Sequence, residues 1–87
     1  MKGYIYILLN KKNNYYIGST NNLKRRLRQH YLGKVASTKA YLPLKCVLSQ
    51  EYNEIKTARR IELKLKKLKR RDYLDRIIAD KEIKMAA

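Results

Sequence analysis

The sequence lacks several features that would assign it to other classes of protein. Its single cysteine, Cys46, lies in the apolar run LKCVLSQ, and a lone cysteine supports neither a disulfide nor a zinc site. No apolar run approaches the roughly 20 residues that a membrane-spanning helix needs, and the N-terminus does not resemble a signal peptide. We therefore expect a protein of the reducing cytoplasm that has no membrane partner.

Aromatic and acidic residues are also scarce. There is no Phe or Trp, so the eight tyrosines are the whole aromatic supply. Only 7 Asp and Glu oppose 22 Lys and Arg, which gives a net charge of +15. Such a surface attracts polyanions, and nucleic acid is the first candidate. The alternative is a solubilising surface on a protein whose genome favours lysine, because charge alone predicts a partner and not an activity.

Hydrophobic periodicity predicts two neighbouring strands near the N-terminus. Residues 3–9 (GYIYILL) and 15–19 (YYIGS) are rich in β-branched and aromatic residues. A turn rich in Asn and Lys joins them, so they predict an antiparallel hairpin. Strand alternation places Tyr6 on the opposite face of this hairpin from Ile5 and Ile7.

The next part of the chain predicts a helix followed by a third strand. The segment STNN provides candidate N-caps for a helix that starts near Leu23. Leu23, Leu27 and Tyr31 form the apolar stripe of this helix. Residues 34–43 predict a loop, and residues 44–52 predict the third strand.

Two further helices complete the predicted fold. Apolar residues recur every three or four positions from about Thr57, and the segment KRRD interrupts this pattern before a last helix that Asp72 can cap. The order ββαβαα predicts an α+β fold, with a three-stranded antiparallel sheet flanked by helices. An 87-residue chain holds one domain with a small core, which we place at residues 1–80, and residues 81–87 are expected to fray.

Polar and aromatic residues gather where the predicted hairpin meets the first helix. Tyr6 and Tyr16 lie on adjacent strands, and Gly18 ends the second strand, where a missing side chain lets a backbone or a ligand approach closely. Arg26 and His30 are four residues apart on the helix, so they share a face at the edge of its apolar stripe. Each also has an ordinary structural interpretation, as sheet filler, strand end, solvated charge or hydrogen-bonded histidine.

Glu62 is the acidic residue that stands out on the long helix. It flanks the apolar stripe of Ile61 and Leu65, and it is the only acid among the many Lys and Arg of residues 56–71. The structural alternative is a helical ion pair, because Glu62 stands four residues before Lys66 in the favourable order.

Several segments together resemble the GIY-YIG nuclease family. They are YIY at 4–6, YIG at 16–18, STNNLKRRLRQH at 19–30 and, for the family's helix that bears the metal-binding glutamate, ARRIELKLKKLKR at 58–70. The resemblance covers nearly the whole chain, from about Gly3 to Ile78. It is greatest to small stand-alone members that are related to the GIY-YIG nuclease domain of the excinuclease.

The resemblance implies a metal-dependent DNA endonuclease, with Mg²⁺ or Mn²⁺ as cofactor and a role in DNA repair. By this resemblance, Tyr6 and Tyr16 match the motif tyrosines, and Gly18 matches the motif glycine. Arg26 and His30 match the arginine and histidine of the family's first helix, and Glu62 matches the metal-binding glutamate. The chain departs from the family pattern in two places. Tyr4 replaces the first motif glycine, and no asparagine near Leu74 matches the one that supports the site in some members.

Phosphodiester hydrolysis requires an activated water, neutralised phosphate charge and a stabilised leaving oxygen. A divalent ion on Glu62 and a guanidinium fork from Arg26 would supply the positive charge. Tyr6 or Tyr16 would deprotonate the water, with His30 in a relay, once cationic neighbours lower the tyrosine pKa from its usual value near 10. The sequence does not distinguish between the two tyrosines.

The basic residues of the helices are the expected contacts to nucleic-acid phosphates, which carry no sequence information. These residues are Arg25, Arg59, Arg60, Lys64, Lys66, Lys67, Lys69, Arg70 and Arg71. We expect DNA as the partner, an association with the nucleoid, and a partner protein or a homodimer for targeting. The alternative is a nucleic-acid-binding module with weak or no cleavage. Docking on ribosomal RNA or an anionic membrane is a third interpretation, but it requires no Tyr–Tyr–Gly–Arg–His–Glu set.

Overall fold

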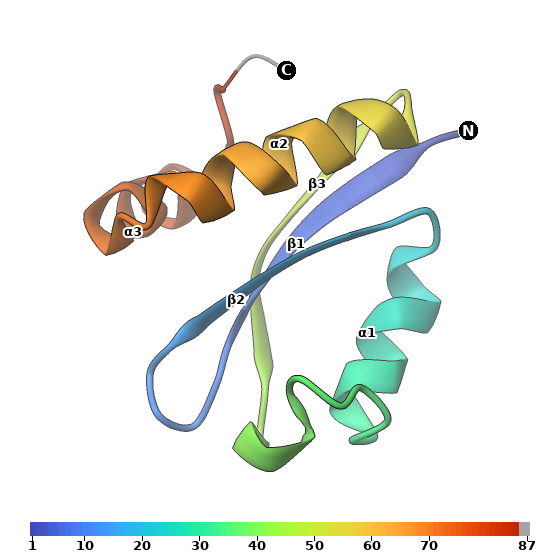
Figure 1. The fold of residues 1–87 in the computed structure, drawn as a ribbon, viewed down its shortest axis with the longest axis vertical. Helices are drawn as coiled ribbons and strands as arrows, with labels where there is room; N and C mark the ends of the chain where they lie inside the picture. The colour runs from blue at the N-terminus through green and yellow to red at the C-terminus, as the bar shows by residue number, and fades with distance from the viewer. Residues whose placement is uncertain (86–87) are drawn as a thin grey trace.

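The structure of the protein, a computed structural model, describes residues 1–85. Three strands form one antiparallel sheet in the order β2-β1-β3, namely β1 (Gly3–Leu9), β2 (Tyr15–Thr20) and β3 (Lys45–Tyr52) (Figure 1). Tyr6 on the central strand lies directly opposite Gly18 on β2. The strand β2 is therefore an edge strand, with a neighbour on one side only.

Three helices complete the order ββαβαα, as the sequence predicted. They are α1 (Leu23–Tyr31), α2 (Ile55–Leu68) and α3 (Arg71–Asp80). The stretch predicted as a loop contains one short 3₁₀ helix, Lys39–Tyr41. Helix α2 begins two residues earlier than expected. The prediction that Asp72 caps the last helix is wrong, because the N-cap is the preceding Arg70, whose guanidinium donates to the Asp72 carboxylate at 2.7 Å.

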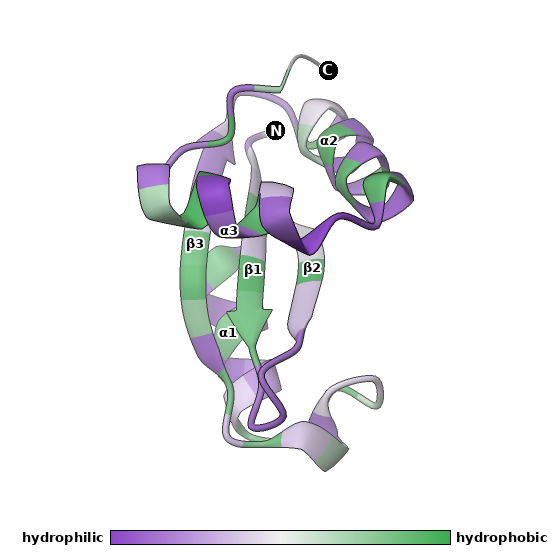
Figure 2. Cartoon of the chain, turned by 90° about the vertical axis from the view of Figure 1, so that its left-hand side faces the viewer, coloured by the Kyte–Doolittle hydropathy of each residue, from purple (hydrophilic) through white to green (hydrophobic). Residues whose placement is uncertain are grey.

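The helices cover both faces of the sheet. Figures 1 and 2 show α1 on one face and α2 with α3 on the other. Strand alternation points Ile5 and Ile7 towards α2, where they pack against Ala58, Ile61 and Leu65 in the main core. The intervening residues of β1 face α1. The predicted alternation is therefore confirmed, and it sends the tyrosine and the isoleucines of β1 to opposite layers.

Helix α1 begins as the sequence predicted but turns a different residue inward. The Asn22 side chain caps the helix by accepting from the Arg25 N–H at 3.1 Å. The predicted stripe ends on Tyr31, which is 45% exposed, whereas His30 is 0% exposed. His30 was expected at the edge of the buried surface and lies inside it instead. The reason is that the sheet under α1 presents a tyrosine hydroxyl, which a histidine can bind and a leucine cannot.

The segment after α3 contains a residue that joins the core. Ile83 is 4% exposed, and its backbone N–H and carbonyl exchange hydrogen bonds with the Gln50 side-chain amide at 2.7 and 2.9 Å. This contact fixes Ile83 within the stretch that was expected to fray, and residues 86 and 87 lie outside the described part. Within residues 1–85, no helix has the length and apolar character needed to cross a membrane.

Candidate active site

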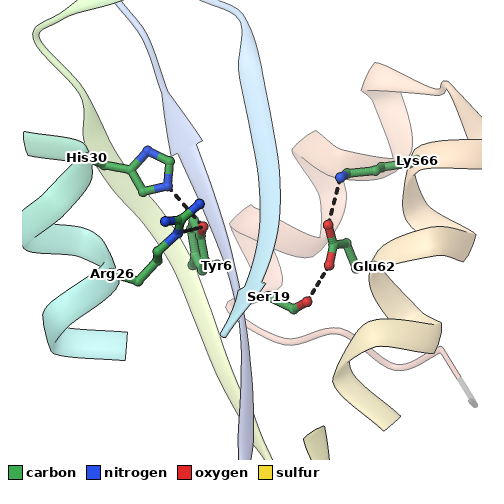
Figure 3. A network of polar contacts seen from close by, with 6 residues as sticks. All are labelled: Tyr6, Ser19, Arg26, His30, Glu62 and Lys66. Atoms are coloured by element: carbon green, nitrogen blue, oxygen red, sulfur yellow. Dashed lines mark hydrogen bonds and ion pairs between the residues drawn. The ribbon is translucent and has the colours of Figure 1, made fainter. Parts of the chain in front are cut away.

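A buried cluster of polar side chains lies between β1 and α1. The Tyr6 hydroxyl is 2.9 Å from Nε2 of His30, and Arg26 donates from Nε to the same hydroxyl at 3.4 Å (Figure 3). Tyr6 is 1% exposed and His30 is 0% exposed. The second guanidinium contact of Arg26, from Nη1 to Gln29 Oε1 at 3.1 Å, holds its side chain on the surface of α1. The phenol is therefore fixed from two sides.

Tyr16 completes this cluster from β2. Its ring lies edge-on to the His30 imidazole, with ring centroids 5.2 Å apart, and 6.4 Å from the ring of Tyr6. Hydrogen bonding to Tyr6 raises the pKa of the Arg26 guanidinium, and Tyr16 contributes to the same shift. The structure thus brings together the two tyrosines, the arginine and the histidine that the sequence singled out.

The other nitrogen of the imidazole is bound by a residue that no pattern in the sequence indicated. Nδ1 of His30 is 2.8 Å from Oγ1 of Thr38, whose side chain is 3% exposed. Thr38 lies just before the short 3₁₀ helix, in the stretch predicted as a loop. A threonine in such a stretch carries no periodic signal, so its position could not be inferred from the sequence.

Gly18 is required by the tyrosine that lies over it. A Cβ atom at Gly18 would be 2.4 Å from both Cζ and the hydroxyl oxygen of Tyr6. The sequence predicted that a backbone or a ligand approaches closely at this glycine. In the structure the group that makes this approach is the Tyr6 phenol, which fills the space that a side chain would occupy.

Glu62 lies on the other side of the edge strand. One of its carboxylate oxygens accepts from the Ser19 hydroxyl, and the other pairs with Nζ of Lys66 at 2.6 Å. Ser19 follows Gly18 on β2, and adjacent strand residues point to opposite faces, so Ser19 faces α2 while Gly18 faces α1. Figure 3 shows Tyr6 and Glu62 separated by β2. Strand parity alone could have identified Ser19 as the partner of Glu62.

Burial controls the protonation of the cluster under α1. Burial raises the pKa of Tyr6 above its usual value and outweighs the hydrogen bond from Arg26, which acts in the opposite direction. The expectation that cationic neighbours lower the pKa of a site tyrosine is therefore wrong for Tyr6. Burial also lowers the pKa of His30 to about 4, with the charge of Arg26 adding to the effect. Both groups are neutral at pH 7.

The carboxylate of Glu62 is the acidic group available to a metal ion here. No group of three or more His, Cys, Asp or Glu able to hold a metal is found among residues 1–85. Mg²⁺ commonly uses one or two carboxylates and completes its shell with waters and substrate phosphates. A single carboxylate whose side chain is 18% exposed fits that pattern, and the exchangeable ion pair with Lys66 leaves it accessible.

The predicted phosphate contacts lie in different places around the molecule. On α2, Arg59 and Lys66 project within about 60° of Glu62, whereas Arg60, Lys64 and Lys67 are turned away by about 140–160°. Lys69 and Arg70 line a hollow between β2 and α3. On α1, Arg25 is exposed.

The Arg71 side chain makes contacts within the fold. Its guanidinium donates to the backbone carbonyl of Asn13 and lies 4.4 Å from the ring centroid of Tyr15. These contacts attach the β1–β2 turn to α3.

A family model described as the GIY-YIG catalytic domain matches residues 2–74. The chain therefore belongs to the GIY-YIG family, whose catalytic domain is a nuclease fold. The match spans both faces of β2 and includes the cluster under α1 together with Glu62.

Within this family, the chain is similar to proteins named UPF0213. It is 40% identical over 70 residues to a UPF0213 protein of Streptococcus pneumoniae serotype 4, covering 79% of this chain and 71% of that protein. It is 35% identical over 79 residues to one from Bacillus licheniformis, covering 90% and 80%. The solution NMR structure of a UPF0213 protein from Bacillus halodurans is 31% identical, with a TM-score of 0.58, and the likeness covers 88% of this chain and 83% of that one.

Proposed function

We propose that the protein is a metal-dependent endonuclease that hydrolyses phosphodiester bonds in DNA. The observation that carries this proposal is the buried Tyr6 hydroxyl, held between His30 Nε2 and Arg26 Nε, beside an edge strand whose other side carries Glu62. Because β2 is an edge strand, a phosphate lying along its outer edge could approach both sides. A protein that only bound phosphates would not require this buried arrangement.

In this proposal the attacking water is activated by a proton relay. The water gives a proton to the Tyr6 hydroxyl oxygen while the Tyr6 proton passes to Nε2 of His30, so no free phenolate forms. This route accommodates the raised pKa of Tyr6, which makes a standing phenolate unfavourable at pH 7. Tyr6 is favoured over Tyr16 as the proton acceptor because its hydroxyl is the one bonded to His30. Tyr16 would support the imidazole by its edge-on contact.

Charge stabilisation would come from both sides of β2. Arg26 is placed to bind a non-bridging phosphate oxygen through the guanidinium nitrogens that do not contact Tyr6. Glu62 would hold Mg²⁺ or Mn²⁺, which when bound supplies positive charge to the phosphate and to the leaving oxygen. Ser19 orients the carboxylate by donating to it, and Lys66 keeps it paired in the absence of metal.

DNA is proposed as the substrate because the chain carries a net charge of +15 on a nuclease fold. The basic side chains near Glu62 would contact phosphates, so binding would have little sequence preference and steep salt dependence. We also propose a cytoplasmic location at the nucleoid, a role in DNA repair, and targeting by a partner protein or by a homodimer.

A nucleic-acid-binding module without appreciable cleavage is the second candidate. It is favoured by the engagement of both Glu62 oxygens, one by Ser19 and one by Lys66. It is also favoured by the absence of an asparagine near Leu74. In that case the same surface would bind DNA tightly and leave it intact.

A cleavage assay tests the proposal. Supercoiled plasmid and a panel of flap, fork and single-stranded DNAs are incubated with the protein in Mg²⁺, in Mn²⁺ and in EDTA. We expect cleavage that depends on the metal and is lost in Glu62→Gln. The matched control is Glu54→Gln, which neutralises an exposed acid paired with the N-terminus and should cleave normally. Tight, salt-sensitive binding without cleavage of any substrate would favour the second candidate.

A further inference from the structure

The imidazole of His30 is held at both nitrogens, and the second partner is outside the family motif. Nε2 contacts the Tyr6 hydroxyl at 2.9 Å, and Nδ1 contacts Oγ1 of Thr38 at 2.8 Å. The Thr38 hydroxyl is in turn 3.5 Å from the carbonyl oxygen of Val35. Thr38 and Val35 are buried, at 3% and 8% exposure. A chain of hydrogen bonds thus runs from Tyr6 into the interior and ends on a backbone carbonyl.

The direction of these hydrogen bonds follows from the group that can only donate. Arg26 Nε is always a donor, so the Tyr6 oxygen accepts from it. The acceptor that the structure offers to the hydroxyl proton of Tyr6, among residues 1–85, is Nε2 of His30. A neutral imidazole that accepts at Nε2 carries its proton on Nδ1 and donates it to Thr38. Thr38 then donates to Val35, and each group in the chain has a partner.

The opposite direction leaves a group unsatisfied. If Thr38 donated to Nδ1, the proton of His30 would be on Nε2 and would point at the Tyr6 oxygen. The hydroxyl proton of Tyr6 would then lack an acceptor among the described residues, at a side chain that is 1% exposed. A buried donor without a partner is destabilising.

We propose that Thr38 is a positioning residue that acts together with Tyr6 to hold His30 in the Nδ1–H tautomer, and so keeps Nε2 free to receive the proton of Tyr6. This inference rests on the proposed function, because it names the residue that prepares the relay acceptor. When the relay operates, the water proton moves to the Tyr6 oxygen and the Tyr6 proton moves to Nε2. The resulting imidazolium donates to Tyr6 from Nε2 and to Thr38 from Nδ1, and the protons balance.

The groups that face His30 come from three elements. Arg26 approaches from α1, Tyr6 from β1 and Tyr16 from β2. The positive charge of Arg26 disfavours the imidazolium. An acceptor at Nδ1 offsets part of that effect, since it binds the N–H of the charged ring more strongly than that of the neutral ring.

Nitrogen NMR of the histidine ring tests this inference directly. His30 is the only histidine in the chain, so protein labelled with ¹⁵N-histidine gives one pair of ring-nitrogen signals. At pH 7 we expect Nδ1 to be the protonated nitrogen in the wild type and in Thr38→Ser. In Thr38→Val, which has nearly the same shape but no hydroxyl, Nδ1–H loses its acceptor while Tyr6 still favours an unprotonated Nε2, so we expect signals of both tautomers. A wild-type spectrum with the proton on Nε2 would overturn the inference even if Thr38→Val failed to fold, and so would a Thr38→Val spectrum that matched the wild type.

Cleavage kinetics separate this inference from the function on which it rests. Thr38→Val should lower kcat by roughly tenfold or more with little change in KM, and Thr38→Ser should recover most of the rate. Wild-type protein that cleaves no substrate would contradict the proposed function while the NMR result still decided the tautomer. Wild-type protein that cleaves, with Thr38→Val equally fast, would overturn the role of Thr38 alone.

Discussion

On the α1 side of β2, Tyr6 and His30 are almost fully buried, and a hydrogen bond joins them. On the α2 side, Glu62 keeps 18% of its side chain exposed and is held by a hydroxyl and by a lysine that is itself 48% exposed. Breaking a buried hydrogen bond leaves an unsatisfied group, whereas an exposed ion pair is worth little and can be exchanged. The first side is therefore fixed before any ligand arrives, and the second is arranged to change partners.

This difference matches the two proposed tasks. A proton relay requires fixed geometry, because a hydrogen bond must already join the donor and the acceptor. A metal site with one carboxylate must exchange its partners as the ion and the substrate enter together. The four predictions that follow test the comparison, from the largest expected effect to the smallest.

The largest loss of stability is expected from a methyl group added at Gly18. The new Cβ would be 2.4 Å from Cζ and from the hydroxyl oxygen of Tyr6, and that ring is buried and bound to His30, so it has no room to move aside. We expect Gly18→Ala to lower the free energy of unfolding by about 3 kcal/mol and to disrupt the relay. Chemical denaturation measures the change. Ser19→Ala is the control, since it changes the next residue without adding volume, and equal stability of the two variants would contradict this account of Gly18.

Acid should destabilise the α1 side through His30. Its pKa is about 4 in the folded protein and 6.5 in the unfolded chain, so the unfolded chain binds more protons between these values. Stability contributed by the neutral imidazole is present above pH 6.5 and is lost as the pH falls towards 4, by about 3 kcal/mol at most. Denaturation of wild type and His30→Gln across this range should show the extra slope in the wild type only. Parallel curves would contradict the burial of a neutral histidine.

On the α2 side, the affinity for metal should rise when Lys66, which competes with the metal ion for Glu62, is replaced. Lys66→Met frees one oxygen of Glu62, so we expect the affinity for Mn²⁺ to rise by roughly two- to fivefold. Lys67→Met removes the same charge from the outer side of α2 and should change the affinity less. Calorimetric titration of both variants with Mn²⁺ compares them, and a weaker site in Lys66→Met would show that Lys66 supports metal binding and does not compete with it.

The smallest expected effect distinguishes two adjacent arginines of α2. Arg59 projects near Glu62 and Arg60 is turned away, although the two carry the same charge. Arg59→Gln should reduce the slope of log affinity for DNA against log salt by about one, while Arg60→Gln should change it less. Fluorescence anisotropy between about 50 and 200 mM salt measures both slopes. Equal slopes would mean that the DNA does not lie along the Glu62 side of α2.

Local patterns in the sequence predicted most of the fold. Alternation in residues 3–9 predicted that Tyr6 and Ile5 face opposite layers, and the Asn-rich segment predicted the Asn22 cap, because both depend on neighbouring residues. The placement of Tyr6 and Tyr16 on adjacent strands also followed from the hairpin. These features need no information about distant contacts.

The parts that could not be predicted depend on tertiary contacts. Thr38 lies in an irregular stretch whose path is set by packing and not by a periodic pattern. The burial of His30 and the raised pKa of Tyr6 required the position of α1 on the sheet, whereas the charge composition pointed to a lowered pKa. The separation of Glu62 from the tyrosines by β2 required the strand order, which the chain order does not specify.

In the proposed function, the two sides of β2 act together in cleavage. The most direct test of this joint action is the single-turnover cleavage rate of Tyr6→Phe. It is measured in the metal-containing assay in which Glu62→Gln is expected to be inactive. Tyr6→Phe keeps the ring over Gly18 and removes only the hydroxyl shared by His30 and Arg26. We predict a rate about 10²–10⁴-fold below the wild type at unchanged DNA affinity, with Tyr16→Phe losing less. A Tyr6→Phe protein that cleaves at the wild-type rate would contradict the account.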